Sequence, residues 1–215
     1  MSAQVHIVGP QFSTFVRSVQ LVCEEKGISY RYGFKPDGEE IEFKSPSHLA
    51  LHPFGKIPAL LHNGQVIFET APICRYLDAA FEGPALQPED LLARAHVDQW
   101  CAALSSYVDQ ALVRNYLLEF AFPKGEDGSI RMDKVAAHQP AVIEMLTLLE
   151  QQLAGKEYFC GAQYSIADAI LTPMLDYLSG LPHAAELMTA TPELAAWTQR
   201  MQARDSGKQV LITRR

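Results

Sequence analysis

The spacing of apolar residues changes partway along the chain, and the change predicts two regions of different structure. Residues 5–8 (VHIV) form a short apolar run that ends at Gly9-Pro10, which predicts a buried strand. The apolar residues that follow recur at the i, i+4, i+7 and i+8 spacing of an amphipathic helix that stops at Gly27: Phe15, Val19, Val22 and Cys23.

A hairpin signal follows in the segment from Ile57 to Ala80. Ile57-Pro58 precedes an apolar strand over residues 59–61, and an X-Pro bond at the entry of a strand is a natural place for a cis peptide. Asn63-Gly64 supplies a two-residue turn before a second strand over residues 66–68. A helix over Thr70–Ala80 comes next.

Two weaker elements complete this region, a strand over residues 29–34 and a short helix over residues 45–51. The order is then β-α-β-α-β-β-α, which predicts a thioredoxin-like domain over residues 1–81. A stretch rich in glycine and proline at residues 82–89 is expected to be a linker.

Residues 90–215 show helical stripes and no strand pattern. Ser165-Ile-Ala-Asp168 is a capping-box-like helix start, and Thr191-Pro192 is expected to open the last helix. The fold class predicted is therefore α/β plus all-α, with an all-helical second domain. Two stripes carry this prediction: Val97, Trp100, Cys101, Leu104, Val108, Ala111 and Leu112, then Val142, Met145, Leu146, Leu149 and Leu153.

Composition narrows the classes of function. An apolar content of 48% is ample for a core, and the absence of a long apolar run predicts no membrane partner. The net charge of −7 disfavours nucleic acid as a partner. The first residues, MSAQVHIV, lack the features of a secretory signal. Four cysteines lie far apart in apolar surroundings, which predicts reduced core cysteines in a cytoplasmic protein: Cys23, Cys74, Cys101 and Cys160.

The segment after the proline suits a small peptide ligand. The ligand's backbone could pair beside Pro58, and its carboxylate could lie on the helix N-terminus at Glu69-Thr70. His48 and His52 share a helical face at the i, i+4 spacing that metals use, but no third ligand is evident. We therefore predict no metal site and interpret both histidines as solvated or capping.

The segment HPFGKIPALLHNGQVIFETAPICRYL, from His52 to Leu77, resembles the glutathione-binding half of the cytosolic glutathione transferases. FSTFVRSVQLVCEEKGI near the start resembles the serine-type members, which are phi-like and bacterial. The resemblance covers the whole chain and is specific over residues 10–80. It implies the glutathione transferase fold, glutathione as co-substrate, a hydrophobic electrophile as second substrate, a role in detoxification and a homodimer.

The resemblance carries the family's thiol-activating hydroxyl to Ser13, with Thr14 able to share the role. A hydroxyl donor and a helix N-terminus both favour a thiolate over a thiol. The alternative is that Ser13 only caps the helix. Cysteine-dependent relatives have their nucleophile at this position, so a serine here favours conjugation over thiol exchange.

The resemblance also places the peptide. Ile57, beside Pro58, would exchange backbone hydrogen bonds with the cysteinyl part. Thr70 and its helix amides would bind the γ-glutamyl carboxylate, and Glu69 would face the ammonium. Lys44 and Lys56 are the candidates for the glycine carboxylate. The chain departs from the pattern at Phe43, where plant phi enzymes often have histidine, and at His52, which replaces an asparagine.

The electrophile pocket is expected between the domains, where apolar clefts are common. For each aromatic residue at helical spacing, the alternative interpretation is that it lies in the core and does not line a pocket. Two other functions stay open: a non-catalytic glutathione-binding or assembly module, and a glutathione-dependent peroxidase or isomerase. The candidates for the pocket lining are Phe12, Phe34, Tyr107, Leu112, Tyr116 and Phe120.

Overall fold

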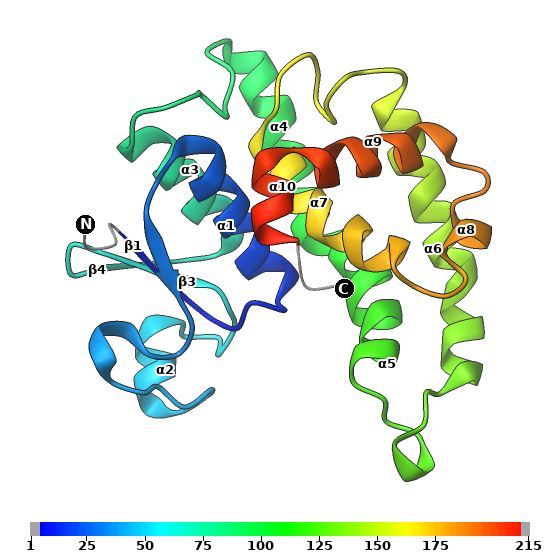
Figure 1. The fold of residues 1–215 in the computed structure, drawn as a ribbon, viewed down its shortest axis with the longest axis horizontal. Helices are drawn as coiled ribbons and strands as arrows, with labels where there is room; N and C mark the ends of the chain where they lie inside the picture. Colours follow the sequence, from blue (N-terminus) through cyan, green and yellow to red (C-terminus); the bar gives the residue numbers. More distant parts are fainter. Residues whose placement is uncertain (1–4, 212–215) are drawn as a thin grey trace.

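A computed structural model describes residues 5–211, and its first half contains a small sheet with helices around it (Figure 1). The predicted order of strands and helices is confirmed, although β2 is shorter than expected. The elements are β1 (Val5–Val8), α1 (Thr14–Lys26), β2 (Tyr30–Tyr32), the 3₁₀-helix η1 (Pro36–Gly38), α2 (Pro46–Leu51), β3 (Ala59–His62), β4 (Gln65–Phe68) and α3 (Thr70–Ala80).

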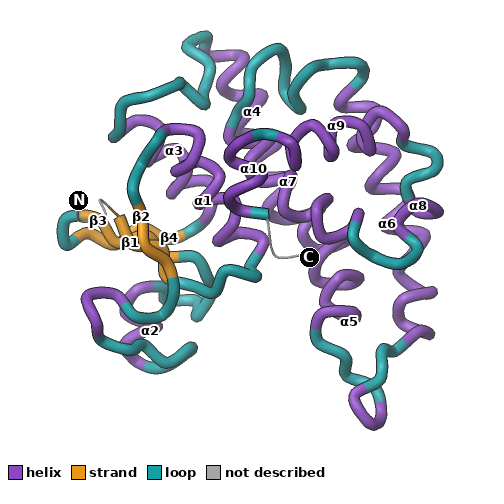
Figure 2. Tube along the Cα trace, viewed as in Figure 1, coloured by secondary structure: helices purple, strands orange, loops and turns teal. Residues whose placement is uncertain are grey.

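The sheet has the strand order β2-β1-β3-β4. β1 pairs in parallel with β2, whereas the β1–β3 and β3–β4 pairs are antiparallel. Asn63 and Gly64 both have positive φ, 50° and 73°, as the predicted two-residue turn requires. α1 and α3 pack together against the sheet, and α2 lies across the sheet from them (Figure 2).

The regular elements described in the second half are all helices, so the predicted fold class is confirmed. Its elements are α4 (Leu91–Ala103), the π-helix η2 (Leu104–Leu117), α5 (Leu118–Ala121), the 3₁₀-helix η3 (Glu126–Gly128), α6 (Met132–Leu153), α7 (Ile166–Ser179), α8 (Ala184–Leu187), α9 (Pro192–Ala203) and α10 (Asp205–Val210).

Two features of this half were not predicted. The helix that Thr191-Pro192 opens is α9, but it is not the last, because the chain turns at Arg204 and continues as α10. Six residues are too few to show an apolar period. Residues 104–117 are wound as a π-helix, in which Arg114 Nε donates to Asp109 Oδ2, five residues earlier, at 2.8 Å.

α7 joins the two halves of the molecule. It is buried along nearly its whole length and packs on α1 as well as on η2, α4 and α9. A single apolar core therefore runs from the sheet into the helical half. This arrangement places the start of α1 beside the C-terminal turns of α7.

The described part of the chain has no helix with both the length and the apolar character that crossing a bilayer requires. Cys23, Cys74 and Cys101 are buried and Cys160 is half-buried, and all four are free thiols. The prediction that the cysteines lie in the core is thus confirmed for the first three.

Candidate functional site

Three segments leave the sheet at the same end. In the strand register Val8 lies opposite Ala59, and Ala59 lies opposite Phe68. The loop that follows β1, the Ile57-Pro58 step before β3 and the Glu69-Thr70 step after β4 therefore emerge side by side. The fold brings together segments that lie far apart in the sequence.

Gly9 allows the first of these segments to approach the second. Its φ is 140°, a value that residues with a Cβ rarely adopt. A Cβ built there would lie 2.7 Å from Val16 Cγ2 and 3.2 Å from Ile57 Cβ. Glycine at this position lets the first turn of α1 pack close to Ile57.

Ser13 is the N-cap residue of α1, as its sequence context predicted. Its Oγ accepts a hydrogen bond from the Val16 amide at 3.4 Å, which is long for such a bond. Within residues 5–211 no hydrogen bond uses the hydroxyl hydrogen of Ser13, and the first turn of α1 holds no acidic residue. A half-buried hydroxyl donor thus lies at the positive end of a helix dipole. The neighbouring Thr14 is buried.

The Ile57-Pro58 peptide bond is cis, as predicted. Ile57 is half-buried and precedes the first paired residue of β3. Among the described residues, no backbone hydrogen bond outside regular elements involves Ile57. Its amide and carbonyl can pair with an extended peptide, and Pro58 is buried beneath it.

Glu69 has φ 70° and ψ 127°, a strained conformation for a residue that is not glycine. Such strain costs about 1–3 kcal/mol and is concentrated at functional sites. Glu69 is exposed, and it begins α3 without capping it through its own side chain. Because Pro72 has no amide, Thr70 and Ala71 supply the amides at this helix start.

Lys44 and Lys56 lie on neighbouring segments, and both are exposed. A Cβ built at Gly55 would lie 3.6 Å from Lys44 Cγ. The amide of Lys44 donates to His48 Nδ1 at 3.1 Å, so the imidazole supports the loop that carries this lysine.

The interpretation of His48 and His52 as solvated is wrong. The two residues are 0% and 2% exposed. The alternative prediction, that they cap a helix, holds for His52, which is the C-cap residue of α2. Burial lowers the pKa of both imidazoles, so both are neutral at pH 7. The i, i+4 pattern identified one shared face but could not say that the face is packed against aromatic rings, among them Phe43 and Phe68. No group of three metal-binding side chains occurs among the residues described.

The structure places the six pocket candidates in different surroundings. Phe12 and Tyr107 are 57% and 74% exposed, and Phe34 packs on Phe43 and His48. Leu112 and Tyr116 are fully buried and have no exposed surface for a substrate to contact.

Tyr116 and Phe120 belong to one cluster in the helical half. The hydroxyl of Tyr116 is hydrogen bonded to His183 Nε2 at 2.6 Å, and Phe120 packs against both rings. Burial raises the pKa of Tyr116. Helical spacing located these side chains on one face but did not distinguish a core from a cleft.

Phe122 was missed by the sequence analysis. Its ring packs edge-on against Phe12 with the centroids 5.9 Å apart, and it is 49% exposed. It lies in a loop after α5, where no periodic pattern could mark it. Phe12 and Phe122 form an apolar surface next to Ser13 that spans the two halves of the molecule.

The cysteines are poor candidates for nucleophiles. Burial raises the pKa of Cys23, Cys74 and Cys101 well above the usual value, and it raises the pKa of Cys160 to about 12. These thiols stay protonated near neutral pH. The chemistry of this site therefore depends on hydroxyls, backbone amides and charged side chains.

Comparisons with known proteins identify the family of the chain. The N-terminal domain model of glutathione S-transferases matches residues 12–80, and the C-terminal domain model matches residues 132–200. Glutathione S-transferase F10 of Arabidopsis thaliana is 31% identical over 207 residues, which are 95% of this chain and 94% of that protein. Poplar glutathione transferase F1 is 25% identical with a TM-score of 0.83, and the match covers 99% of each chain. Maize glutathione S-transferase I in complex with an atrazine glutathione conjugate is 25% identical with a TM-score of 0.82, covering 98% of this chain and 97% of that one.

Proposed function

The chain belongs to the glutathione S-transferase family and is a glutathione transferase, and from that premise we propose that the Ser13 hydroxyl holds the glutathione sulfur as a thiolate. The observation that carries this proposal is that no hydrogen bond among residues 5–211 uses the hydroxyl hydrogen of Ser13, which lies at a helix start with no acid in its first turn. A thiol with a pKa near 8.5 is only ~3% ionised at pH 7. Lowering that pKa by about two units takes about 2.7 kcal/mol of preference for the anion.

The tripeptide would lie along the end of the sheet. Ile57 pairs with the backbone of the cysteinyl residue. The hydroxyl of Thr70 and the amides that open α3 bind the γ-glutamyl carboxylate, and Glu69 faces the ammonium. Lys44 and Lys56 are the cations available to the glycine carboxylate. The positive φ of Glu69 supports its assignment to the ammonium group. A strained backbone at this helix start leaves the carboxylate exposed, where a ligand can reach it.

The thiolate then attacks an electrophilic carbon of an apolar substrate. The new S–C bond forms as the leaving group departs with its electron pair, and the thiol proton has already passed to solvent. Ser13 keeps its hydrogen throughout. The exposed rings of Phe12 and Phe122 offer an apolar surface for the second substrate. Thr14 is buried, which leaves Ser13 as the better placed of the two hydroxyls.

A Ser13→Ala variant tests the thiolate assignment. We expect it to remain bound to glutathione resin while its kcat/KM on a generic aryl halide falls by about 30- to 100-fold, because one charge-assisted hydrogen bond is lost. Ser129→Ala, which removes a hydroxyl from the loop before α6, is the control and should match the parent protein. Equal rates for Ser13→Ala and the parent would remove Ser13 from its role.

A Glu69→Gln variant tests the peptide assignment. It keeps the shape of the side chain and removes the charge opposite the ammonium, so retention on glutathione resin should weaken by about 5-fold or more. Glu126→Gln changes an exposed glutamate at the start of η3 and should leave retention unchanged. Unchanged retention of the Glu69 variant would show that the γ-glutamyl end binds elsewhere.

We also propose that the protein acts as a homodimer in the cytoplasm and removes toxic electrophiles. The free thiols of the cysteines support the cytoplasmic setting, and membership of the glutathione S-transferase family supports the homodimer and the detoxifying role. The ring of Phe54 is 71% exposed and is one apolar group that a second copy could cover. Sedimentation of the purified chain tests the assembly, and a monomer at micromolar concentration would contradict it.

A further inference from the structure

The two peptide carbonyls immediately before Ser13 are both held by long polar side chains. Arg17 Nε donates to the carbonyl oxygen of Gln11 at 2.9 Å. The hydroxyl of Tyr177 donates to the carbonyl oxygen of Phe12 at 2.8 Å. Tyr177 belongs to α7, so a residue of the helical half is hydrogen bonded to the loop that leads to Ser13.

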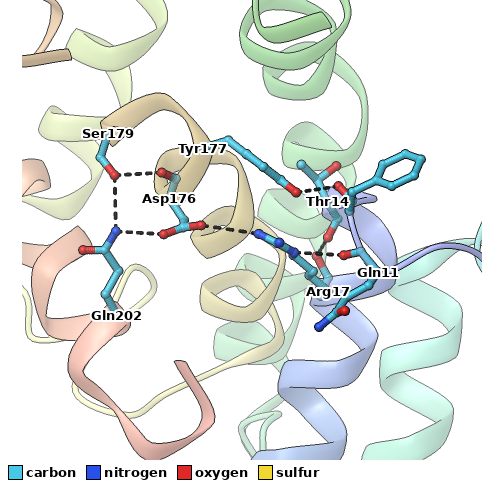
Figure 3. Close-up of polar contacts among 9 residues, drawn as sticks. Gln11, Thr14, Arg17, Asp176, Tyr177, Ser179 and Gln202 are labelled. Carbon is cyan, nitrogen blue, oxygen red and sulfur yellow. Dashed lines mark hydrogen bonds and ion pairs between the residues drawn. The ribbon is translucent and has the colours of Figure 1, made fainter. Parts of the chain in front are cut away.

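Arg17 is itself anchored on α7 (Figure 3). Its side chain is fully buried, Nη1 lies 3.4 Å from Asp176 Oδ2, and its guanidinium lies 4.5 Å from the centre of the Tyr177 ring. Burying a charge is costly unless it is paired, and a packed apolar side chain would often serve stability as well. The buried arginine therefore serves to hold its two partners in a fixed arrangement. Its planar guanidinium can bind a carbonyl oxygen and a carboxylate at fixed angles.

Asp176, which accepts from Arg17, is itself held by a further hydrogen bond. Gln202, from the C-terminal end of α9, donates to Asp176 Oδ1 at 2.9 Å and to Ser179 Oγ at 3.2 Å. Ser179 Oγ donates to the carbonyl of Asp176 at 2.8 Å. The contacts run from α9 through α7 to the Gln11–Phe12 loop, and Figure 3 shows them as one chain.

The position of the Ser13 hydroxyl depends on this loop. The cap bond from Val16 to Ser13 Oγ is 3.4 Å long and therefore weak, so it fixes the side chain poorly. The loop carbonyls lie one and two residues before Ser13, and a small shift of a catalytic group lowers rates markedly. We propose that Arg17 and Tyr177 are positioning residues that hold the Ser13 hydroxyl at the glutathione sulfur. This inference rests on the role proposed for Ser13.

Tyr177→Phe is the test, because it keeps the ring over Arg17 and removes only the hydroxyl. Ultraviolet absorbance of the thiolate across a pH series reports the apparent pKa of bound glutathione. We expect that pKa to rise by about 0.5 to 1 and kcat/KM to fall by about 3- to 10-fold, with little change in glutathione binding. Arg17→Lys keeps the charge but loses the fork, so it should give a shift at least as large.

Tyr158→Phe is the matched control. Its hydroxyl accepts a bond from Arg204, which pairs with Glu25 near the other end of α1. This change loosens a different contact of α1, the one made through Arg204 at the start of α10, at a distance from Ser13. A purely structural role for Tyr177 would lower the melting temperature in both variants and leave the apparent thiol pKa unchanged in both, and that result would overturn the proposal.

The double variant Ser13→Ala/Tyr177→Phe separates the two claims. If Tyr177 acts through Ser13, its effect on the thiol pKa is absent in the Ser13→Ala background. An equal effect in both backgrounds would overturn the positioning role while Ser13 keeps its own. If Ser13→Ala alone leaves the thiol pKa unchanged, the role proposed for Ser13 fails and the positioning role fails with it.

Discussion

Among the described helices whose N-cap residue is a serine, α1 and α7 have starts that are built differently. At α7, Ser165 belongs to a capping box in which Asp168 accepts bonds from the Ser165 amide at 2.9 Å and from its hydroxyl at 2.8 Å. At α1, the Ser13 hydroxyl makes, within the described part of the chain, only the long bond from the Val16 amide, and the first turn of the helix holds no acid. The hydroxyl hydrogen of Ser165 is used inside the protein, whereas that of Ser13 remains available to a ligand.

The electrostatics of the two starts differ in the same sense. Asp168 is fully buried and places a carboxylate at the positive end of α7, so that helix end is already satisfied. The start of α1 has no such anion and faces the end of the sheet from which Ile57 emerges. The same residue type thus stabilises a fold at one helix and is poised to stabilise a bound anion at the other.

Among the variants that test this difference between the two helix starts, Asp168→Ala should have the largest effect on the free energy of unfolding. It leaves the Phe159 amide and both donors of Ser165 without their acceptor, so we expect about 3 kcal/mol less free energy of unfolding in urea at pH 7. Asp133→Ala, at the exposed first turn of α6, should cost about 0.5 kcal/mol or less. A loss no larger at Asp168 than at Asp133 would contradict the structural role of the box.

The pH dependence of that loss has a definite sign. Burial raises the pKa of Asp168 to about 6, against the opposing hydrogen bonds from Phe159 and Ser165. Because the folded protein holds this proton more tightly than the unfolded chain, the contribution of Asp168 is greatest below pH 4 and falls as the pH rises toward 6. The deficit of Asp168→Ala should therefore grow as the pH is lowered from 7 to 5.

Ser13→Asp should leave stability nearly unchanged and abolish most activity. Aspartate caps a helix about as well as serine, so the free energy of unfolding should change by about 0.5 kcal/mol or less. Its carboxylate repels the thiolate, so kcat/KM should fall about 100-fold or more, and further than in Ser13→Ala. Activity above that of Ser13→Ala would mean that the sulfur does not lie beside this side chain.

His48→Gln should have a smaller effect, visible as pH dependence. Burial lowers the pKa of His48, so the neutral ring stabilises the fold above pH ~6.5, and this contribution is lost as the pH falls through the folded pKa. The parent should lose stability and glutathione retention on acidification more steeply than the variant, by at most about 1.4 kcal/mol per pH unit. Parallel pH profiles would show that His48 does not titrate in this range.

Thr14→Val should have the smallest effect. Its side chain is buried, and the proposed chemistry assigns it no part once Ser13 is present. We expect kcat/KM within about 2-fold of the parent and a stability change of about 0.5 kcal/mol or less. A larger fall in kcat/KM at unchanged stability would mean that the two hydroxyls share the sulfur.

The sequence determined the local elements and much of the candidate site. Periodicity located α1, Asn63-Gly64 located the hairpin turn, and the cis bond at Pro58 was predicted from its position before a strand. These features depend on residues close together in the chain, where backbone preferences and hydrogen bonds act directly. The resemblance to glutathione transferases rested on the same local motifs.

Only the tertiary structure decided which of these features share a space. The strand register brings Ser13, Ile57 and Glu69 to one end of the sheet, and no spacing in the sequence shows this. Packing also buried His48, and it placed Tyr177 on the loop before Ser13, 165 residues from its acceptor Phe12. Burial and long-range pairing depend on how whole elements pack together. The pattern of residues along one segment does not show which other segment will cover it.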